Sequence, residues 1–175
     1  MILIPGLIVT ICTFPGVIVH EFAHRFFCDL CGVPVYRVCY FRPGNPAGYV
    51  IHGPVDSLGA AMLISLGPLI VNSVLCMLLT FPFVIPTFIL HEPQHNLTLW
   101  VLGYLGLSIG MHAFPSSTDI NSLYEHIKAN SRSGAVLISS RLILKPLAMI
   151  GAVASMFWFD ALYAVGLSFI LPTLL

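Results

Sequence analysis

Long apolar runs constrain the fold of this sequence more than any other feature. Four runs are long enough to cross about 30 Å of hydrocarbon: residues 2–27, 58–83, 97–114 and, less cleanly, 143–171. Hydrophobic residues make up 58% of the chain and charged residues 8%, far from the balance of a soluble domain. The sequence predicts an all-α polytopic membrane protein with four or five transmembrane helices and a short β-like loop after the first span.

The fourth run leaves the number of crossings open. Asp160 follows the aromatic residues 157–159, which could form an interfacial turn between two short segments or the middle of one helix. We expect a single membrane-embedded domain over residues 1–175, with a core at 1–123 and a C-terminal membrane segment at 134–175. No internal repeat of the transporter kind is visible.

The charged residues predict how the chain is oriented. Seven Lys and Arg balance seven Asp and Glu, so we expect no nucleic-acid partner. Basic residues gather in loops 32–56 and 116–142, which the positive-inside rule places in the cytoplasm, with the N-terminus and loop 91–96 outside. The first run lacks a basic leader, which favours a retained span. We expect a multi-pass protein of a prokaryotic cell membrane.

One motif in the first run carries metal chemistry: His20-Glu21-Phe22-Ala23-His24. Residues four apart share a helix face, so His20 and His24 can bind one zinc ion while Glu21 projects beside them. A catalytic Zn²⁺ keeps one position for water, and the neighbouring glutamate accepts the proton as water attacks a carbonyl. The alternative is a pair of core histidines with Glu21 paired to Arg25, but ionisable groups in lipid favour a metal site.

Two other patterns have metal-ligand spacing. The segment 91–95 repeats the His-Glu-x-x-His pattern, but Pro93 disrupts a helix there and the segment falls in an outer loop, so we interpret it as coincidental. Cys28 and Cys31 have ligand spacing and Cys39 lies nearby, yet reduced structural thiols are the favoured interpretation.

Zinc needs a third protein ligand from the same side of the membrane. The candidates are Asp119, His112, Glu125 and His126. Asp119 is favoured because it follows Pro115 at the cytoplasmic end of the third span, at a depth similar to that of the motif. His112 lies one or two helical turns deeper and could instead orient a ligand or the substrate. Asp119 could also cap a helix, and both roles could coexist.

In order and type, three features over residues 15–123 resemble the site-2 protease family of intramembrane metalloproteases. They are the motif at 20–24, Gly67-Pro68 followed by Asn72 in the next span, and the segment 115–119 after the third. The resemblance implies a three-helix core whose zinc is held by the two motif histidines and a distant aspartate, which here is Asp119.

The chain also departs from the family pattern. One extra residue follows Gly67-Pro68 and places Asn72 a step late, His112 stands where asparagine is usual, and the spacer to Asp119 is shorter by one. These departures indicate a divergent, minimal member, with Asn72 and His112 in supporting or substrate-binding roles. Helix packing is the alternative for Gly67, Pro68 and Asn72.

The segment Gly48-Tyr49-Val50-Ile51-His52 resembles the short strand that family members place near the site to align an extended substrate. An unwound substrate segment needs partners for its backbone groups, which a strand edge supplies. Gly48, Tyr49 and Val50 are therefore candidate substrate-binding residues. An ordinary cytoplasmic loop is the alternative.

Together these features predict a zinc endopeptidase with one Zn²⁺ per chain. It would cleave a peptide bond in or near the transmembrane segment of a membrane protein in the lipid bilayer, with its site toward the cytoplasm. Two alternatives stay open: a non-catalytic metal-binding or transport protein, and a di-iron lipid desaturase or hydroxylase, since 20–24 and 91–95 both have His-box spacing. The charge pattern places those two segments on opposite faces, which argues against the second.

Overall fold

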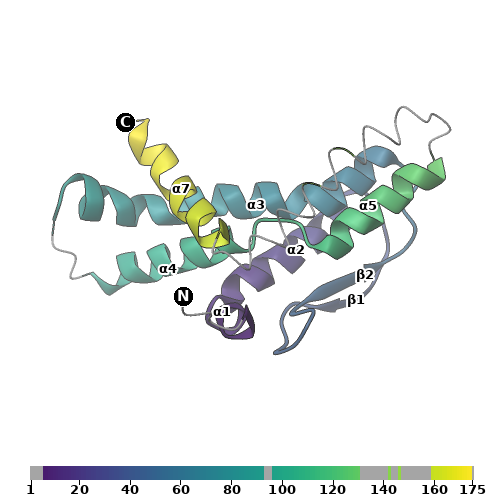
Figure 1. Ribbon diagram of the computed structural model, residues 1–175, viewed down its shortest axis with the longest axis horizontal. Coiled ribbons are helices and arrows are strands. Elements are labelled where there is room, and N and C mark those ends of the chain that lie inside the picture. The colour runs from purple at the N-terminus through teal and green to yellow at the C-terminus, as the bar shows by residue number, and fades with distance from the viewer. Residues whose placement is uncertain (1–5, 93–95, 131–141, 143–145, 147–158, 175) are drawn as a thin grey trace.

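The structure, a computed structural model, describes residues 6–92, 96–130, 142, 146 and 159–174. This part of the chain is mostly helical with one small antiparallel sheet (Figure 1). The elements are α1 (Gly6–Cys12), α2 (Phe14–Leu30), β1 (Val35–Cys39), β2 (Tyr49–His52), α3 (Leu58–Val84), the π-helical turn η1 (Ile85–Ile89), α4 (Leu97–Met111), α5 (Ser117–Asn130) and α7 (Phe159–Thr173).

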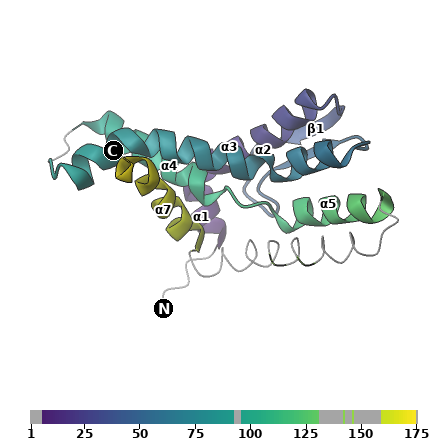
Figure 2. The same ribbon diagram turned by 90° about the horizontal axis from the view of Figure 1, so that it is seen from above.

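Helix α3 is the central helix of the molecule. It runs along the long axis and contacts α2, α4, α5 and α7 (Figures 1 and 2). Ser57 caps its start by accepting a 3.1 Å hydrogen bond from the Ala60 amide. The continuous helix Leu58–Ile89 is the one helix of the described residues that is long and apolar enough to cross a membrane, whereas Leu97–Met111 and Phe159–Thr173 are apolar but shorter.

The first apolar run is not one continuous helix, contrary to the prediction. It breaks at Thr13 (φ −115°, ψ 29°) between α1 and α2. Pro15 enters the first turn of α2, where it lacks the amide that would bond to the preceding turn and its ring crowds that turn. The Thr13 hydroxyl donates to the Val9 carbonyl at 2.7 Å and so closes the end of α1.

The segment after α4 was predicted as a loop, and for residues 117–130 that prediction is wrong. Helix α5 forms there because Ile120, Leu123 and Ile127 recur at helical spacing and pack against Ala61 of α3. Of the predicted fourth run, 143–171, the structure describes position 146 and the part that falls in α7, with Asp160 in the first turn of that helix. Whether this run crosses once or twice depends on residues outside the described part, as does most of the predicted segment 134–175.

The β-like segment predicted after Gly48 is a strand, and its partner β1 was not predicted. The two strands pair antiparallel. The hairpin folds back along α2 (Figure 1): Val35 packs beside Cys28 near the end of α2, while the rings of Phe41 and Phe14 lie 5.7 Å apart at its first turn. The strands therefore lie alongside the helix that carries the metal motif.

Two glycines let α2 approach its neighbours closely. A side chain at Gly16 would collide with the Ser108 carbonyl of α4, and one at Gly67 with the Phe27 ring. The Ser108 carbonyl and the Phe27 ring occupy the space that a methyl group would need, so α2 packs closely against both α3 and α4. This close packing sets the position of the motif side chains.

Candidate metal centre

Helix α2 turns its polar residues inward. Gly16, His20, His24 and Cys28 follow one another at intervals of four residues and all are buried. At 3.6 residues per turn this spacing forms one ridge, which faces α3 and α4. Glu21 is buried beside the ridge. Two imidazoles and a carboxyl group thus enter an apolar interior from one helix.

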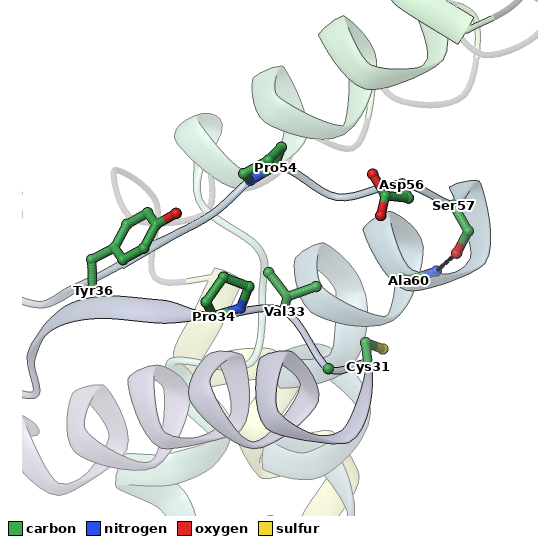
Figure 3. Close-up of a pocket in the computed structure, with 9 residues that line it drawn as sticks. Cys31, Val33, Pro34, Tyr36, Pro54, Asp56, Ser57 and Ala60 are labelled. Atoms are coloured by element: carbon green, nitrogen blue, oxygen red, sulfur yellow. Dashed lines mark hydrogen bonds between the residues drawn. The ribbon is translucent and has the colours of Figure 1, made fainter.

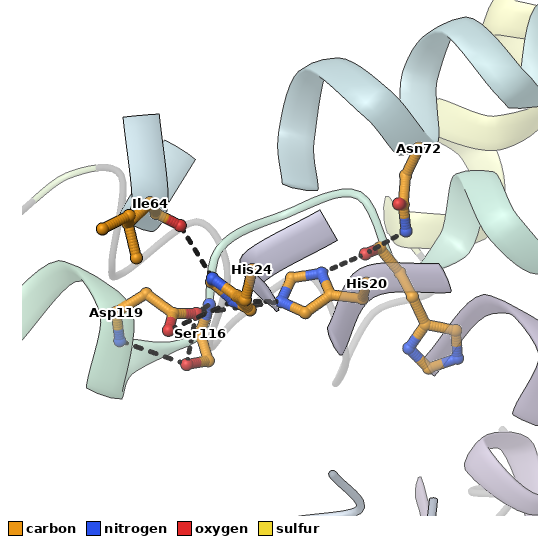
Figure 4. Close-up of polar contacts among 7 residues, drawn as sticks. His20, His24, Ile64, Asn72, Ser116 and Asp119 are labelled. Atoms are coloured by element: carbon orange, nitrogen blue, oxygen red, sulfur yellow. Dashed lines mark hydrogen bonds and ion pairs between the residues drawn. The ribbon is translucent and has the colours of Figure 1, made fainter. Parts of the chain in front are cut away.

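The side chains of His20, His24 and Asp119 converge (Figure 4), as predicted from the motif and from the resemblance. The two histidine Nε2 atoms lie 3.1 Å apart, and Asp119 oxygens lie 3.8 Å from His20 Nε2 and 3.4 Å from His24 Nε2. Ligand atoms bound tetrahedrally at zinc distances would be about 3.3 Å apart. The two Asp119 distances run to different oxygens, Oδ2 for His20 and Oδ1 for His24. With one ligand atom taken from each residue, all three atoms lie within 4.8 Å of one another, a grouping that could hold a metal ion such as zinc.

Backbone carbonyls fix which imidazole nitrogens face the centre. Nδ1 of His20 donates to the carbonyl oxygen of His112 and Nδ1 of His24 to that of Ile64, each at 2.7 Å. A carbonyl can only accept, so both protons of the neutral rings are on Nδ1. Both Nε2 atoms then present lone pairs to each other and to a carboxylate, an arrangement that requires a cation or an added proton between them.

Asp119 is held in place by the start of α5. The amide and hydroxyl of Ser116 donate to its Oδ2 at 2.7 and 2.6 Å, and its own amide donates to the Ser116 hydroxyl at 3.2 Å. This is a capping box in which Ser116 is the N-cap and Asp119 the third helical residue. The capping role and the cluster role therefore coexist. Burial alone would raise the pKa of Asp119, but an added proton on His20 or His24 would supply hydrogen bonds and positive charge that outweigh burial and hold this pKa well below its usual range.

Asn72 supports His20 indirectly. Its Nδ2 donates to the carbonyl oxygens of His112 at 2.9 Å and Ile109 at 3.2 Å. The first of these carbonyls is the one that accepts from His20, so the Asn72 amide holds the acceptor that orients the ligand (Figure 4). Asn72 is fully buried, and its Oδ1 has no hydrogen-bond partner among the described residues.

The side chain of His112 forms a hydrogen bond at the α1–α2 junction, whereas its main-chain carbonyl accepts a hydrogen bond from His20. Its Nε2 lies 2.7 Å from the Thr13 hydroxyl, whose own proton goes to Val9. Nε2 of His112 is therefore the donor, and the ring ties the end of α4 to the break between α1 and α2. Among the described residues the His112 side chain does not join the cluster of His20, His24 and Asp119, which leaves Asp119 as the candidate third ligand.

Glu21 faces the hairpin. A Cβ built on Gly48 would lie 2.5 Å from Cγ and 2.8 Å from Oε1 of Glu21, so the backbone just before β2 touches this side chain. Only glycine at position 48 leaves room for the Glu21 side chain where it lies. Tyr49 and Val50 follow as the first residues of β2. The predicted base and the predicted substrate-aligning strand are thus in contact.

The remaining candidates lie apart from the cluster. Glu125 pairs with Lys128 at 3.6 Å, and His126 faces Asn130 on exposed α5. His91 follows η1 in a left-handed conformation (φ 55°), while residues 93–95 lie outside the described part.

The cysteines do not join the cluster either. Cys28 is buried against Val33 and Ile64, and Cys39 is a free thiol in β1. Cys31 lines a separate open pocket of about 380 Å³ between the end of α2, the hairpin and the start of α3 (Figure 3). The described positions of these thiols agree with the structural interpretation of Cys28.

The sequence interpretation missed three residues that build the site. Ser116 was detectable, because Ser-x-x-Asp before an apolar pattern is capping-box spacing. Thr13 and the carbonyl of Ile64 left no local signal, since their partners lie far away in the chain.

Comparison of the chain with protein-family models, with curated proteins and with solved structures finds no match.

Proposed function

We propose that this protein is an intramembrane zinc endopeptidase that cleaves a peptide bond in or near the transmembrane segment of a membrane protein. One observation carries the proposal: the lone pairs of two Nδ1-anchored imidazoles converge on the half-buried carboxylate of Asp119, with Glu21 next to them on the same helix. A purely structural cluster would pair donors with acceptors. This one is arranged for a cation.

His20, His24 and Asp119 would hold the ion. A zinc ion bound there supplies Lewis-acid activation of water and of the scissile carbonyl. Glu21 accepts the proton as the water oxygen attacks the carbonyl carbon, and donates it to the amide nitrogen as the carbon–nitrogen bond breaks. One water is consumed, and a new carboxyl and a new amino terminus are formed. Burial of Glu21 excludes other water from this proton transfer.

The exterior of α2 supports a membrane location. A second ridge of this helix is apolar and open, with exposed fractions between 36% and 64%. Its members are Phe14, Ile18, Phe22, Phe26 and Leu30. Polar residues inside and large apolar residues outside are the reverse of a water-soluble helix and suit a lipid environment.

Further support comes from how the element ends are distributed. The end of α2, the start of α3 and α5 lie toward one end of the molecule, and η1 and the start of α4 lie at the other (Figure 1). We propose that α2, α3 with η1, α4 and α7 cross the membrane, with the end that carries α5 in the cytoplasm as the basic loops indicate. Ile64 and Asn72, level with the site, are then roughly 10 and 20 Å along α3 from its cytoplasmic start.

This geometry agrees with a divergent member of the site-2 protease family. The three motif regions of the resemblance contact one another through α2, α3 and the α4–α5 connection. In the proposed reaction an unwound substrate segment adds to the edge of β2, where Tyr49 and Val50 offer backbone partners beside Glu21.

A di-iron oxygenase is disfavoured by distance. His91 lies beyond Ile89, which is 17 residues along the helix from Asn72, roughly 25 Å. Two His boxes so far apart would not share a di-iron centre. A non-catalytic metal-binding protein would use the same three ligands. It differs in that no cleavage would depend on Glu21.

The test compares variants in cleavage of a membrane substrate captured by crosslinking to Glu21→Gln. Glu21→Gln should retain zinc and lose cleavage by at least a hundredfold, whereas His24→Ala should lose both. Glu125→Gln, an exposed glutamate paired with Lys128, is the matched control and should cleave normally. Wild-type turnover in Glu21→Gln would refute the assignment of the base, and a zinc-loaded wild type that cleaves nothing captured would favour the non-catalytic alternative.

A further inference from the structure

Two arginines of the hairpin gather over one aromatic ring. The guanidinium carbons of Arg37 and Arg42 lie 5.9 and 5.3 Å from the ring centroid of Tyr49. Such stacking uses the faces of the guanidinium groups and leaves N–H groups at their edges available to acceptors. We call Arg37 and Arg42, which both stack on Tyr49, the hairpin cation pair.

These two charges have no counterion within the described part of the chain. Its ion pairs within 4 Å leave out both arginines, and both are exposed. Arg42 makes one further hydrogen bond, from Nε to the Pro46 carbonyl at 2.9 Å. Two like charges drawn to one ring repel each other, and a bound anion would relieve that repulsion.

The cation pair stacks on Tyr49 at an open face of the sheet. Tyr49 comes directly after Gly48, the residue that touches Glu21. Arg37 pairs with Ile51 and Cys39 with Tyr49, so the side chains of Arg37, Tyr49 and Ile51 share one face. Ile51 is 48% exposed, so this face is not covered by the described residues.

The other edge of β2 is free for an incoming strand. Within the described residues β2 pairs with β1 alone. A peptide added to that edge would place every second side chain on the face that carries Tyr49, next to the arginines. The position of the cation pair relative to Glu21 then sets which part of the peptide it meets: a residue close to the scissile bond.

We propose that the hairpin cation pair binds an aspartate or glutamate of the substrate, within a few residues of the bond that is cleaved. This inference rests on the proposed peptidase function and names its substrate class: membrane proteins with an acidic residue beside the cleaved bond. Charge-assisted contacts from two guanidinium groups would supply roughly tenfold or more in affinity. A lipid phosphate would satisfy the same donors, but the arginines stack on Tyr49, the first residue of the substrate-aligning strand and the neighbour of Gly48 beside Glu21, which favours the peptide.

The experiment measures peptide binding by zinc-loaded Glu21→Gln in vesicles of zwitterionic lipid. Three labelled peptides share an apolar span of about 20 residues and carry Asp, Asn or Lys at the same position after it. We expect the Asp peptide to bind about tenfold tighter than the Asn peptide and the Lys peptide to bind weakest. Arg37→Glu combined with Arg42→Glu should reverse the order. Lys128→Glu, which also replaces a positive charge with a negative one but lies on α5, should leave the order unchanged.

Equal binding of the three peptides, or an Asp preference that survives the double charge reversal, would overturn the inference. So would an effect of the double reversal that is confined to vesicles with anionic lipid, because the arginines would then bind lipid headgroups. Failure of the proposed function looks different: the Asp preference would be present in binding while the wild-type protein cleaves none of the peptides. Cleavage without any charge preference would refute the inference and leave the peptidase intact.

Discussion

Replacing Gly48 with alanine should disable catalysis without disturbing the metal. The added Cβ would lie 2.5 Å from Cγ, 2.8 Å from Oε1 and 2.9 Å from Cδ of Glu21, whereas carbon–carbon contacts are normally 3.5–4.0 Å. Relief requires a movement of about 1 Å between the strand and the glutamate. Misplacement of a catalytic group by this amount costs about a hundredfold in rate, or roughly 2.7 kcal/mol of transition-state stabilisation.

The assay is cleavage of a captured membrane substrate by Gly48→Ala, with zinc content measured on the same sample. We expect kcat/KM to fall about a hundredfold while one zinc per chain is retained, because the three atoms nearest to the added methyl group all belong to Glu21 and none to His20, His24 or Asp119. Gly44→Ala, in the same hairpin with only Arg42 Nε at 4.0 Å from the new methyl group, is the control and should keep wild-type activity. A Gly48→Ala protein as active as the control would refute the contact between hairpin and base as a catalytic feature.

Three further substitutions test the supports of the site. Gly67→Ala should lower the free energy of unfolding by about 1 to 3 kcal/mol, because its methyl group meets an aromatic ring of α2, and thermal unfolding in detergent measures this. Asn72→Ala should weaken zinc binding 10- to 100-fold in chelator competition, since the carbonyl that orients His20 loses its anchor. Ser116→Ala removes a side-chain hydrogen bond to Asp119 and the N-cap of α5, so unfolding should become easier by about 1 kcal/mol and zinc binding weaker. Wild-type zinc affinity in both of the last two variants would contradict the support network.

The residues of the proposed metal site were predictable to different degrees. His20 and His24 follow from helix geometry, because a spacing of four puts both on one face of any helix. Asp119 lies 95 residues beyond His24; its expected depth after Pro115 favoured it among four candidates, and the resemblance to a known order of motifs strengthened that choice. The partners of the imidazole Nδ1 atoms are main-chain carbonyls. Every residue carries a carbonyl, so sequence alone does not indicate which one will accept.

The fold was predictable where hydrophobic pattern and helix agree, as in α3. The break at Thr13 was missed because the apolar pattern continues across it, although Pro15 is a signal for a new first turn. Helix α5 was missed because its low hydrophobicity outweighed the spacing of Ile120, Leu123 and Ile127. The strand β1 has no signal that separates it from a loop. It forms because Tyr49–His52 pairs with it along α2.

X-ray absorption at the zinc edge of the purified, zinc-loaded protein tests the central claim most directly. The account predicts a first shell of nitrogen and oxygen at about 2.0–2.2 Å, with the outer-shell scattering of two imidazoles from His20 and His24 and the remaining light atoms from Asp119 and solvent. Sulfur at about 2.3 Å would place the metal at Cys28 and Cys31 instead, and would contradict the account.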